Sequence, residues 1–266
     1  AGEMTPPRLA IATAPFRQTL RESIVTAQTC GAAGVQFDAR YELKPAEFGV
    51  TARRQLLHEL RERDLSVASL DFPLRSTIYD ADRIDDRMAA LRRTMEFASQ
   101  LKSSVVTVRS GPLPEDENSA EAVRLADVLE DLARYGNHIG ATLCLTSAGA
   151  DAEQLAAVVR EAVRQGPLAV DFDPAAALLA RRQPGADLRT LHDCLGQFQL
   201  RDAVRDTQTS GRETALGRGE IDWDEMFALI GEMHFRGWLV VRRNEGDDRV
   251  GDAARAVKYA KAVMLE

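Results

Sequence analysis

Short apolar segments alternate with longer segments of helical period along the whole chain. Eight short runs rich in apolar and β-branched residues predict buried strands at 9–12, 35–38, 65–71, 105–109, 142–146, 168–173, 197–202 and 238–243. Between them, apolar residues recur every three or four positions, as Leu125, Val128, Leu129 and Leu132 do. This alternation predicts a parallel sheet whose strands are connected by crossover helices.

Helix start and stop signals support this pattern. Three pairs offer a capping oxygen with an acceptor three residues later: Asn118 with Glu121, Asp151 with Gln154, and Asp222 with Glu225. Eight strand and helix units favour a single (β/α)8 TIM barrel over residues 1–266. A doubly wound sheet is less consistent with the sequence, because the turn at 13–16 has no glycine and so offers no phosphate-binding loop.

The longest connection, residues 203–218, follows the seventh expected strand. It is rich in Asp, Thr, Ser and Gly and is too long for a simple turn. We expect a mobile lid over the mouth of the barrel, and a surface loop without such a role is the alternative.

Composition narrows the classes of partner. With 34 Lys and Arg against 41 Asp and Glu, the chain has a net charge of −7, which disfavours nucleic acid. No apolar run approaches the ~20 residues needed to cross a bilayer, so we expect no membrane partner. The first residues lack the basic and apolar stretches of a signal peptide, which predicts a cytoplasmic protein. Cys30, Cys144 and Cys194 form no close pair in the sequence and are expected to be reduced, packed thiols.

Candidate binding residues follow from the barrel, because ligands bind at the C-terminal ends of its strands. The polar residues at those ends are Asp38, Asp71, Arg109, Thr146, Asp171, Asp173, Gln199, Asp202, Arg242 and Arg243. Carboxylates, guanidiniums and amides in one ring suit a small hydroxylated or carboxylated ligand. The alternative is that these side chains only pair with one another.

The histidines argue against several kinds of active site. His58, His138, His192 and His234 all fall in expected helices or at their ends, outside the barrel. A zinc site and a Ser-His nucleophile are therefore not indicated.

The C-terminal third resembles a known family through three segments. These are Gln199-Leu200-Arg201-Asp202, then Leu216-Gly217-Arg218-Gly219-Glu220-Ile221-Asp222-Trp223, then Gly237-Trp238-Leu239-Val240-Val241-Arg242. The order and spacing resemble the xylose isomerase-like barrels, a group of sugar phosphate isomerases and epimerases. Weaker matches continue upstream at 35–38, 106–109 and 171–174.

The resemblance implies a divalent cation held by Glu, Asp, His and Glu at the ends of strands five to eight. Those positions fall on Thr146, Asp173, Gln199 and Arg242 in this chain. Thr and Gln are poor ligands for a divalent ion, and Arg242 places a positive charge where the family has a negative one. We therefore expect no metal cofactor, and we expect Arg242 to lie within hydrogen-bond reach of Asp171 or Asp173.

These observations give one main functional hypothesis and two alternatives. The main hypothesis is an isomerase-like or epimerase-like barrel that binds a sugar-like ligand but lacks metal-dependent proton transfer, with Arg205 as a further ligand contact suggested by the resemblance. One alternative is a metal-independent isomerase with Asp38, Asp173 or Asp202 as base and Arg109 or Arg242 stabilising an enediolate. The other is a non-catalytic subunit that binds a paralogous enzyme, and a homo-oligomer is also compatible with the sequence.

Overall fold

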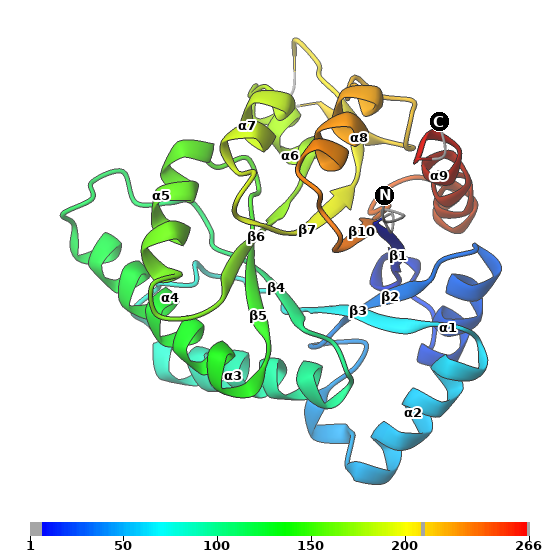
Figure 1. Cartoon of the computed structure of the whole chain (residues 1–266), viewed down its shortest axis with the longest axis horizontal. Helices are drawn as coiled ribbons and strands as arrows, with labels where there is room; N and C mark the ends of the chain where they lie inside the picture. Colours follow the sequence, from blue (N-terminus) through cyan, green and yellow to red (C-terminus); the bar gives the residue numbers. More distant parts are fainter. Residues whose placement is uncertain (1–6, 209–210, 265–266) are drawn as a thin grey trace, which may run out of the picture.

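The computed structural model describes residues 7–208 and 211–264 and contains a closed parallel barrel (Figure 1). The hydrogen-bonded order around the barrel is β1, β10, β7, β6, β5, β4, β3, β2. Its strands are β1 (Arg8–Ala12), β2 (Gly34–Asp38), β3 (Ser66–Asp71), β4 (Val105–Arg109), β5 (Thr142–Thr146), β6 (Leu168–Phe172), β7 (Leu195–Leu200) and β10 (Trp238–Val241). The eight predicted strands and the TIM-barrel fold are confirmed.

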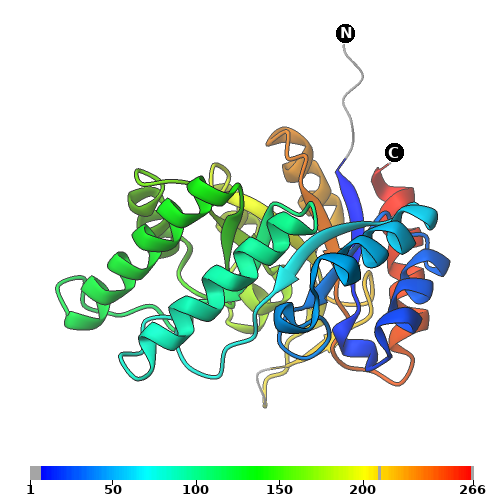
Figure 2. The same cartoon turned by 90° about the horizontal axis from the view of Figure 1, so that it is seen from below.

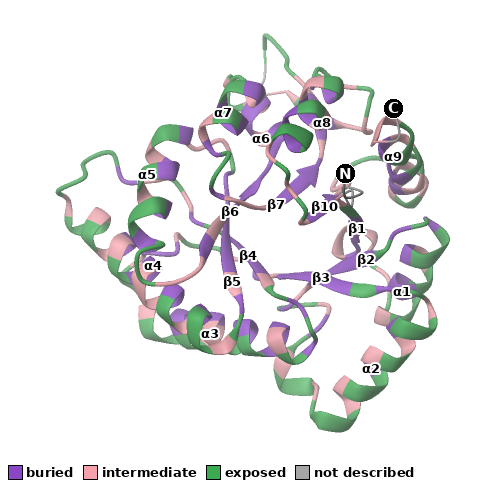
Figure 3. Ribbon diagram, in the orientation of Figure 1, coloured by how far each residue is buried: buried purple, intermediate pink, exposed green. Residues whose placement is uncertain are grey.

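Helices surround the barrel and follow its strands along the chain. They are α1 (Leu20–Thr29), α2 (Val50–Glu62), α3 (Ile84–Gln100), α4 (Ala120–Ile139), α5 (Ala152–Ala162), α6 (Pro174–Leu179), α7 (Pro184–Thr190), α8 (Trp223–Glu232) and α9 (Arg249–Met264). Short 3-10 turns η1 (Ala14–Phe16) and η2 (Pro45–Glu47) lie in the loops after β1 and β2. Buried positions concentrate on the strands and on the inner faces of the helices (Figure 3).

The apolar core has two parts, as expected for a barrel covered by helices. The larger part lies between strands and helices, where the rings of Phe198 and Trp223 are 6.4 Å apart. A smaller cluster of Ala10, Ala12, Ala68, Trp238 and Val240 fills the barrel interior. Because strand side chains alternate between these two sides, the remaining inward positions are free to carry polar residues.

The helix caps agree with the sequence at two of three positions. Asp151 accepts from the N–H of Gln154, and Asp222 accepts from the N–H of Glu225, each at 3.0 Å. At α4 the prediction of Asn118 is wrong. Ser119 is the cap and accepts from the N–H of Ala122 at 3.1 Å, because the helix begins one residue later than the spacing to Glu121 indicated.

The long connection after β7 contains a β-hairpin, which the sequence analysis missed. Strand β8 (Asp202–Val204) pairs antiparallel with β9 (Arg212–Thr214), and β8 contacts α6. In Figure 1 the hairpin stem lies among α6 and α8 at the edge of the barrel, so the stem does not cross the mouth as a lid. Residues 209–210 of the expected lid lie outside the described residues.

Two further expectations concern membrane-spanning helices and the cysteines. Throughout 7–208 and 211–264, no helix combines the length and apolar character that a membrane span requires. Cys30, Cys144 and Cys194 are free and buried, as predicted. Burial raises the pKa of the Cys194 thiol to about 11.

Candidate ligand site at the barrel mouth

In Figure 2 the first strand runs downward from the N-terminus, so the carboxyl ends of the parallel barrel strands face the side opposite the N-terminus. Polar side chains gather at these strand ends. They divide into two hydrogen-bonded networks and a chain of ion pairs. Arg109 is exposed and Asp38, Asp71 and Arg242 are partly exposed, whereas Asp171 and Asp173 are buried. The accessible part of the site therefore lies toward β2, β3, β4 and β10.

The first network joins the ends of β2, β3, β4 and β10. Arg242 Nη2 donates to Gln36 Oε1 at 3.0 Å and lies 3.6 Å from Asp71 Oδ2. Gln36 Nε2 donates to Ser69 Oγ at 2.8 Å and to Thr107 Oγ1 at 3.3 Å. Thr107 Oγ1 in turn donates to Asp71 Oδ1 at 2.8 Å. The loop of hydrogen bonds thus holds one guanidinium and one carboxylate in fixed positions at the mouth.

Two further carboxylates lie at the end of β2 and in the loop that follows it. Burial raises the pKa of Asp38, and the Asp71 charge adds to this, although the N–H groups of Tyr41 and Arg40 oppose it. Burial likewise raises the pKa of Glu42, which accepts from Thr13 Oγ1 at 2.7 Å and from Ser23 Oγ at 3.3 Å. Asp38 is thus a partly exposed carboxyl whose neutral form is favoured by its surroundings.

The second network surrounds Asp171, which is fully buried at the end of β6. Thr146 Oγ1 donates to it at 2.9 Å, Gln197 Nε2 at 3.0 Å and Gln199 Nε2 at 2.6 Å. Burial raises the pKa of Asp171 to about 6, although these hydrogen bonds lower it. The surroundings of Asp171 therefore consist of neutral donors, with no guanidinium bound to its carboxyl oxygens among the described residues.

This environment predicts a distinct pH dependence of stability. An Asp ionises near 3.8 when unfolded, so between about pH 4 and 6 the unfolded chain loses this proton while folded Asp171 keeps it. The Asp171 contribution therefore falls as pH rises through this window, by roughly 3 kcal/mol, and is constant above it. Urea unfolding of wild type and Asp171→Asn from pH 4 to 8 measures the difference between the two curves. A difference that does not change across this range would contradict the prediction.

Asp173 belongs to a chain of ion pairs in which Asp173 and Glu213 are buried and the other members are partly buried. It pairs with Arg201, whose Nε donates to Glu213 Oε2 at 2.9 Å. Glu213 Oε1 also accepts from Arg243 Nη1 at 2.9 Å, and Arg243 Nε reaches Asp252 at 2.9 Å. Burial opposes the charge on Arg201, but Asp173 and Glu213 outweigh it and raise the pKa of its guanidinium.

The predicted contact of Arg242 with Asp171 or Asp173 is therefore wrong. The guanidinium that compensates Asp173 is that of Arg201, and Arg242 is bound to Gln36 and Asp71 across the barrel. The physical reason is that Arg201 reaches Asp173 directly, which leaves Arg242 free to neutralise Asp71.

Asp202 was a candidate ligand contact, but its oxygens are occupied by the chain itself. They accept from the indole Nε1 of Trp223 at 2.9 Å. Backbone N–H groups donate as well, at 2.9 to 3.2 Å, from Ala203, Gly217, Gly219 and Ile221. Asp202 is therefore a buried acceptor that fixes the conformation of the glycine-containing loop. Neither Asp202 nor Asp173, which is paired with Arg201, is available as the base of the alternative mechanism.

Arg205, also a candidate ligand contact, is likewise bound to another residue of the chain. Its guanidinium Nη2 lies 3.2 Å from Glu220 Oε1, and its backbone N–H donates to the same carboxylate. Both side chains are exposed at the hairpin, so the structure does not bring Arg205 together with the networks at the mouth.

Arg109 lines a separate hollow of the mouth. A cavity of about 510 Å³ lies between the loops after β4 and β5, where Ser147, Asp151 and Gln154 also line it. The exposed guanidinium of Arg109 is available for a carboxylate or phosphate group of a ligand.

The positions at which the resemblance places metal ligands do not fit a divalent cation. Thr146 and Gln199 both donate to Asp171, Asp173 is paired with Arg201, and Arg242 is itself a cation. Over the described ranges, no three His, Cys, Asp or Glu side chains are grouped so that they could hold a metal ion. The four histidines are exposed, consistent with their expected place outside the barrel.

Sequence reasoning missed Gln36, Glu42 and Glu213. Gln36 carried a usable signal, because it is the polar residue inside the apolar run Val35-Gln36-Phe37 and so faces the barrel interior. Glu42 lies in a loop and Glu213 in the three-residue strand β9, neither of which carries a periodic pattern, and their positions depend on tertiary contacts.

Comparisons with known proteins agree with this architecture. The profile of the xylose isomerase-like TIM barrel family matches residues 24–263. A xylose isomerase domain protein from Planctomyces limnophilus is similar at 19% identity and a TM-score of 0.83, over 97% of this chain and 96% of that one. An L-ribulose 3-epimerase is similar at 16% identity and a TM-score of 0.79, over 98% and 95%. A xylose isomerase-like TIM barrel protein from Mycobacterium smegmatis, solved in complex with magnesium, is similar at 12% identity and a TM-score of 0.77, over 99% of this chain and 98% of that one. Among curated proteins, no sequence matches this chain.

Proposed function

Because this chain belongs to the xylose isomerase-like TIM barrel family, we propose that its mouth binds a small polyhydroxylated or carboxylated molecule without a divalent cation. The observation that carries the proposal is the position of Arg242 at the end of β10, bound to Gln36 and Asp71. A fixed guanidinium there offers to a ligand oxygen the positive charge that a metal ion would otherwise supply.

The neighbouring groups suit the same class of ligand. Asp38 and Asp71 are partly exposed acceptors for hydroxyl groups, and Arg109 lies exposed at the end of β4. A chain of hydroxyls with a terminal carboxylate could therefore bind between carboxylates at one end and guanidinium groups at the other. Several of the similar structures bear the names of sugar 3-epimerases, which supports a sugar-like ligand.

A binding experiment tests this proposal. Pentoses, hexoses and the matching aldonic acids are screened by thermal shift and calorimetry on protein treated with EDTA, with and without added Mn²⁺. We expect saturable binding that does not require Mn²⁺ and that weakens about 10-fold or more in Arg242→Gln, because a hydrogen bond to a charged group contributes ~1.5 to 3 kcal/mol.

Arg164→Gln is the matched control, since Arg164 is exposed and pairs only with Glu161 among the described residues. Its affinity should equal that of wild type. Binding that depends on Mn²⁺, or that is unchanged in Arg242→Gln, would contradict the proposal.

One observation favours a catalytic activity in addition to ligand binding. Of the three carboxylates considered as a base, Asp38 alone is partly exposed, and burial raises its pKa. A base is most effective when its pKa approaches the working pH. Proton abstraction is tested by measuring, after EDTA treatment of the protein, whether the carbon-bound hydrogens of the bound ligand exchange in D₂O. Absence of exchange would leave ligand binding as the function.

A further inference from the structure

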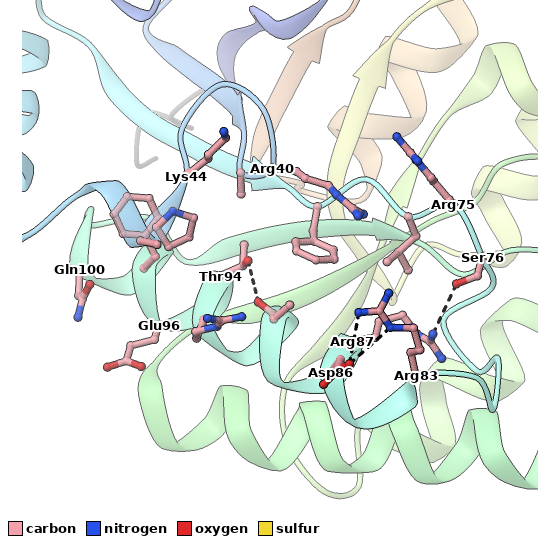
Figure 4. A pocket seen from close by; sticks show the side chains of 18 residues that line it. Arg40, Lys44, Arg75, Ser76, Arg83, Asp86, Arg87, Thr94, Glu96 and Gln100 are labelled. Atoms are coloured by element: carbon pink, nitrogen blue, oxygen red, sulfur yellow. Dashed lines mark hydrogen bonds and ion pairs between the residues drawn. The ribbon is translucent and has the colours of Figure 1, made fainter.

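A second and larger cavity lies outside the barrel mouth, beside α3. It has a volume of about 830 Å³ and is bounded by α3 and by the loops that follow β2 and β3 (Figure 4). None of Asp38, Asp71, Arg109 and Arg242 lines it. We call it the α3 groove, and it is distinct from the candidate site at the mouth.

The floor of the α3 groove is apolar. Phe72 and Leu74 come from the loop after β3, Pro45 comes from the loop after β2, and Ala90 and Phe97 come from α3. Ala90 has the smallest side chain of these five residues. An apolar surface of this kind favours the hydrocarbon or aromatic part of a ligand.

The rim of the groove is strongly cationic. Its charged residues are Arg40, Lys44, Arg75, Arg83, Arg87 and Arg93 against Asp86 and Glu96. The whole chain has a net charge of −7, so this local excess of positive charge is opposite to the balance of the protein. The field inside the groove therefore favours an anion.

Some of these cations are already used by the fold. Arg87 is buried, and its Nε donates to the carbonyl of Ile78 at 3.1 Å. Arg83 lies 3.5 Å from Asp86, and Lys44 lies 3.8 Å from Glu47. These three side chains shape the groove.

Three other cations remain available to a ligand. Arg40 donates to the carbonyl of Pro73 at 3.1 Å, and Arg75 donates to the Tyr41 hydroxyl at 3.3 Å. Across residues 7–208 and 211–264, neither of them nor Arg93 is in an ion pair. In Figure 4, Arg40 and Arg75 lie on the opposite side of the groove from Arg83 and Arg87.

We propose that the α3 groove binds an organic anion with an apolar body and one carboxylate, sulfonate or phosphate group. The body lies on the floor near Ala90, and the charged group contacts Arg40 and Arg93 at the rim. The volume is within the range of pockets that hold small molecules, roughly 300 to 1,000 Å³.

The experiment uses two naphthalene probes that differ in charge. The anion is 8-anilinonaphthalene-1-sulfonate, and its neutral analogue is N-phenyl-1-naphthylamine, each titrated by fluorescence into the folded protein. We expect the double variant Arg40→Gln/Arg93→Gln to lose at least 10-fold in affinity for the anion and less than 2-fold for the neutral probe. Ala90→Trp fills the floor and should weaken both probes.

Two further variants keep the test specific. Arg164→Gln should bind both probes as wild type does, because it removes one exposed arginine that does not line the groove. Arg242→Gln, at the mouth, should also leave both affinities unchanged. The proposal is overturned if the Arg40/Arg93 double variant binds the anion as tightly as wild type, or if Arg242→Gln weakens it equally.

Discussion

Replacing Asp202 with alanine is expected to lower the free energy of unfolding by about 4 kcal/mol. The carboxylate accepts from four backbone N–H groups and from the Trp223 indole, and it is 1% exposed. Removing it leaves several buried donors without an acceptor, and the loop from Gly217 to Ile221 loses the group around which it folds. Urea unfolding monitored by circular dichroism measures the loss.

Asp222→Ala is the matched control, because Asp222 lies in the same loop but accepts one N–H as the cap of α8. Loss of a cap costs about 1 kcal/mol. Asp202→Asn should fall between the two, since it keeps one carbonyl acceptor. Equal losses in Asp202→Ala and Asp222→Ala would show that the buried contacts of Asp202 contribute little.

Glu213→Ala is expected to cost about 3 to 5 kcal/mol, because it removes the carboxylate between two guanidiniums. The side chains of Glu213 and Arg201 are 2% and 10% exposed. Without Glu213, Arg201 keeps Asp173 and Arg243 keeps Asp252, but the charge balance of the chain is lost. The N–H groups of Asn244 and Glu245 also lose the acceptor that joins the hairpin to the end of β10.

Thermal and urea unfolding of Glu213→Ala are compared with those of Glu220→Ala. Glu220 pairs with Arg205 on the surface of the same hairpin, where solvent screens the interaction, so its loss should leave stability nearly unchanged. If the two variants are equally stable, the buried ion pairs do not hold the hairpin in place.

The sequence predicted the barrel because each of its units is locally consistent. The run Val105–Arg109 and the stripe Leu125, Val128, Leu129 and Leu132 carry their own periodicity, so strand and helix can be read without tertiary information. Strand ends were also informative, since they placed Asp38, Asp71, Arg109 and Arg242 at one mouth.

The partners of those side chains could not be predicted in the same way. Arg242 bonds to Gln36, which is 206 positions away in the chain, and its choice of Asp71 over Asp173 depends on the reach of Arg201. The hairpin was missed because each of its strands has only three residues. In strands so short, the alternation of polar and apolar residues has no room to appear.

The ion pairs that run from Asp173 to Asp252 also limit how this sequence can evolve. Loss of Arg201 leaves the buried Asp173 without its ion-pair partner, and loss of Glu213 takes one carboxylate partner from both Arg201 and Arg243, so a further change must follow before stability returns. Substitutions at positions 173, 201, 213 and 243 are therefore expected to be correlated. Relatives of this chain should retain the set together or replace it together.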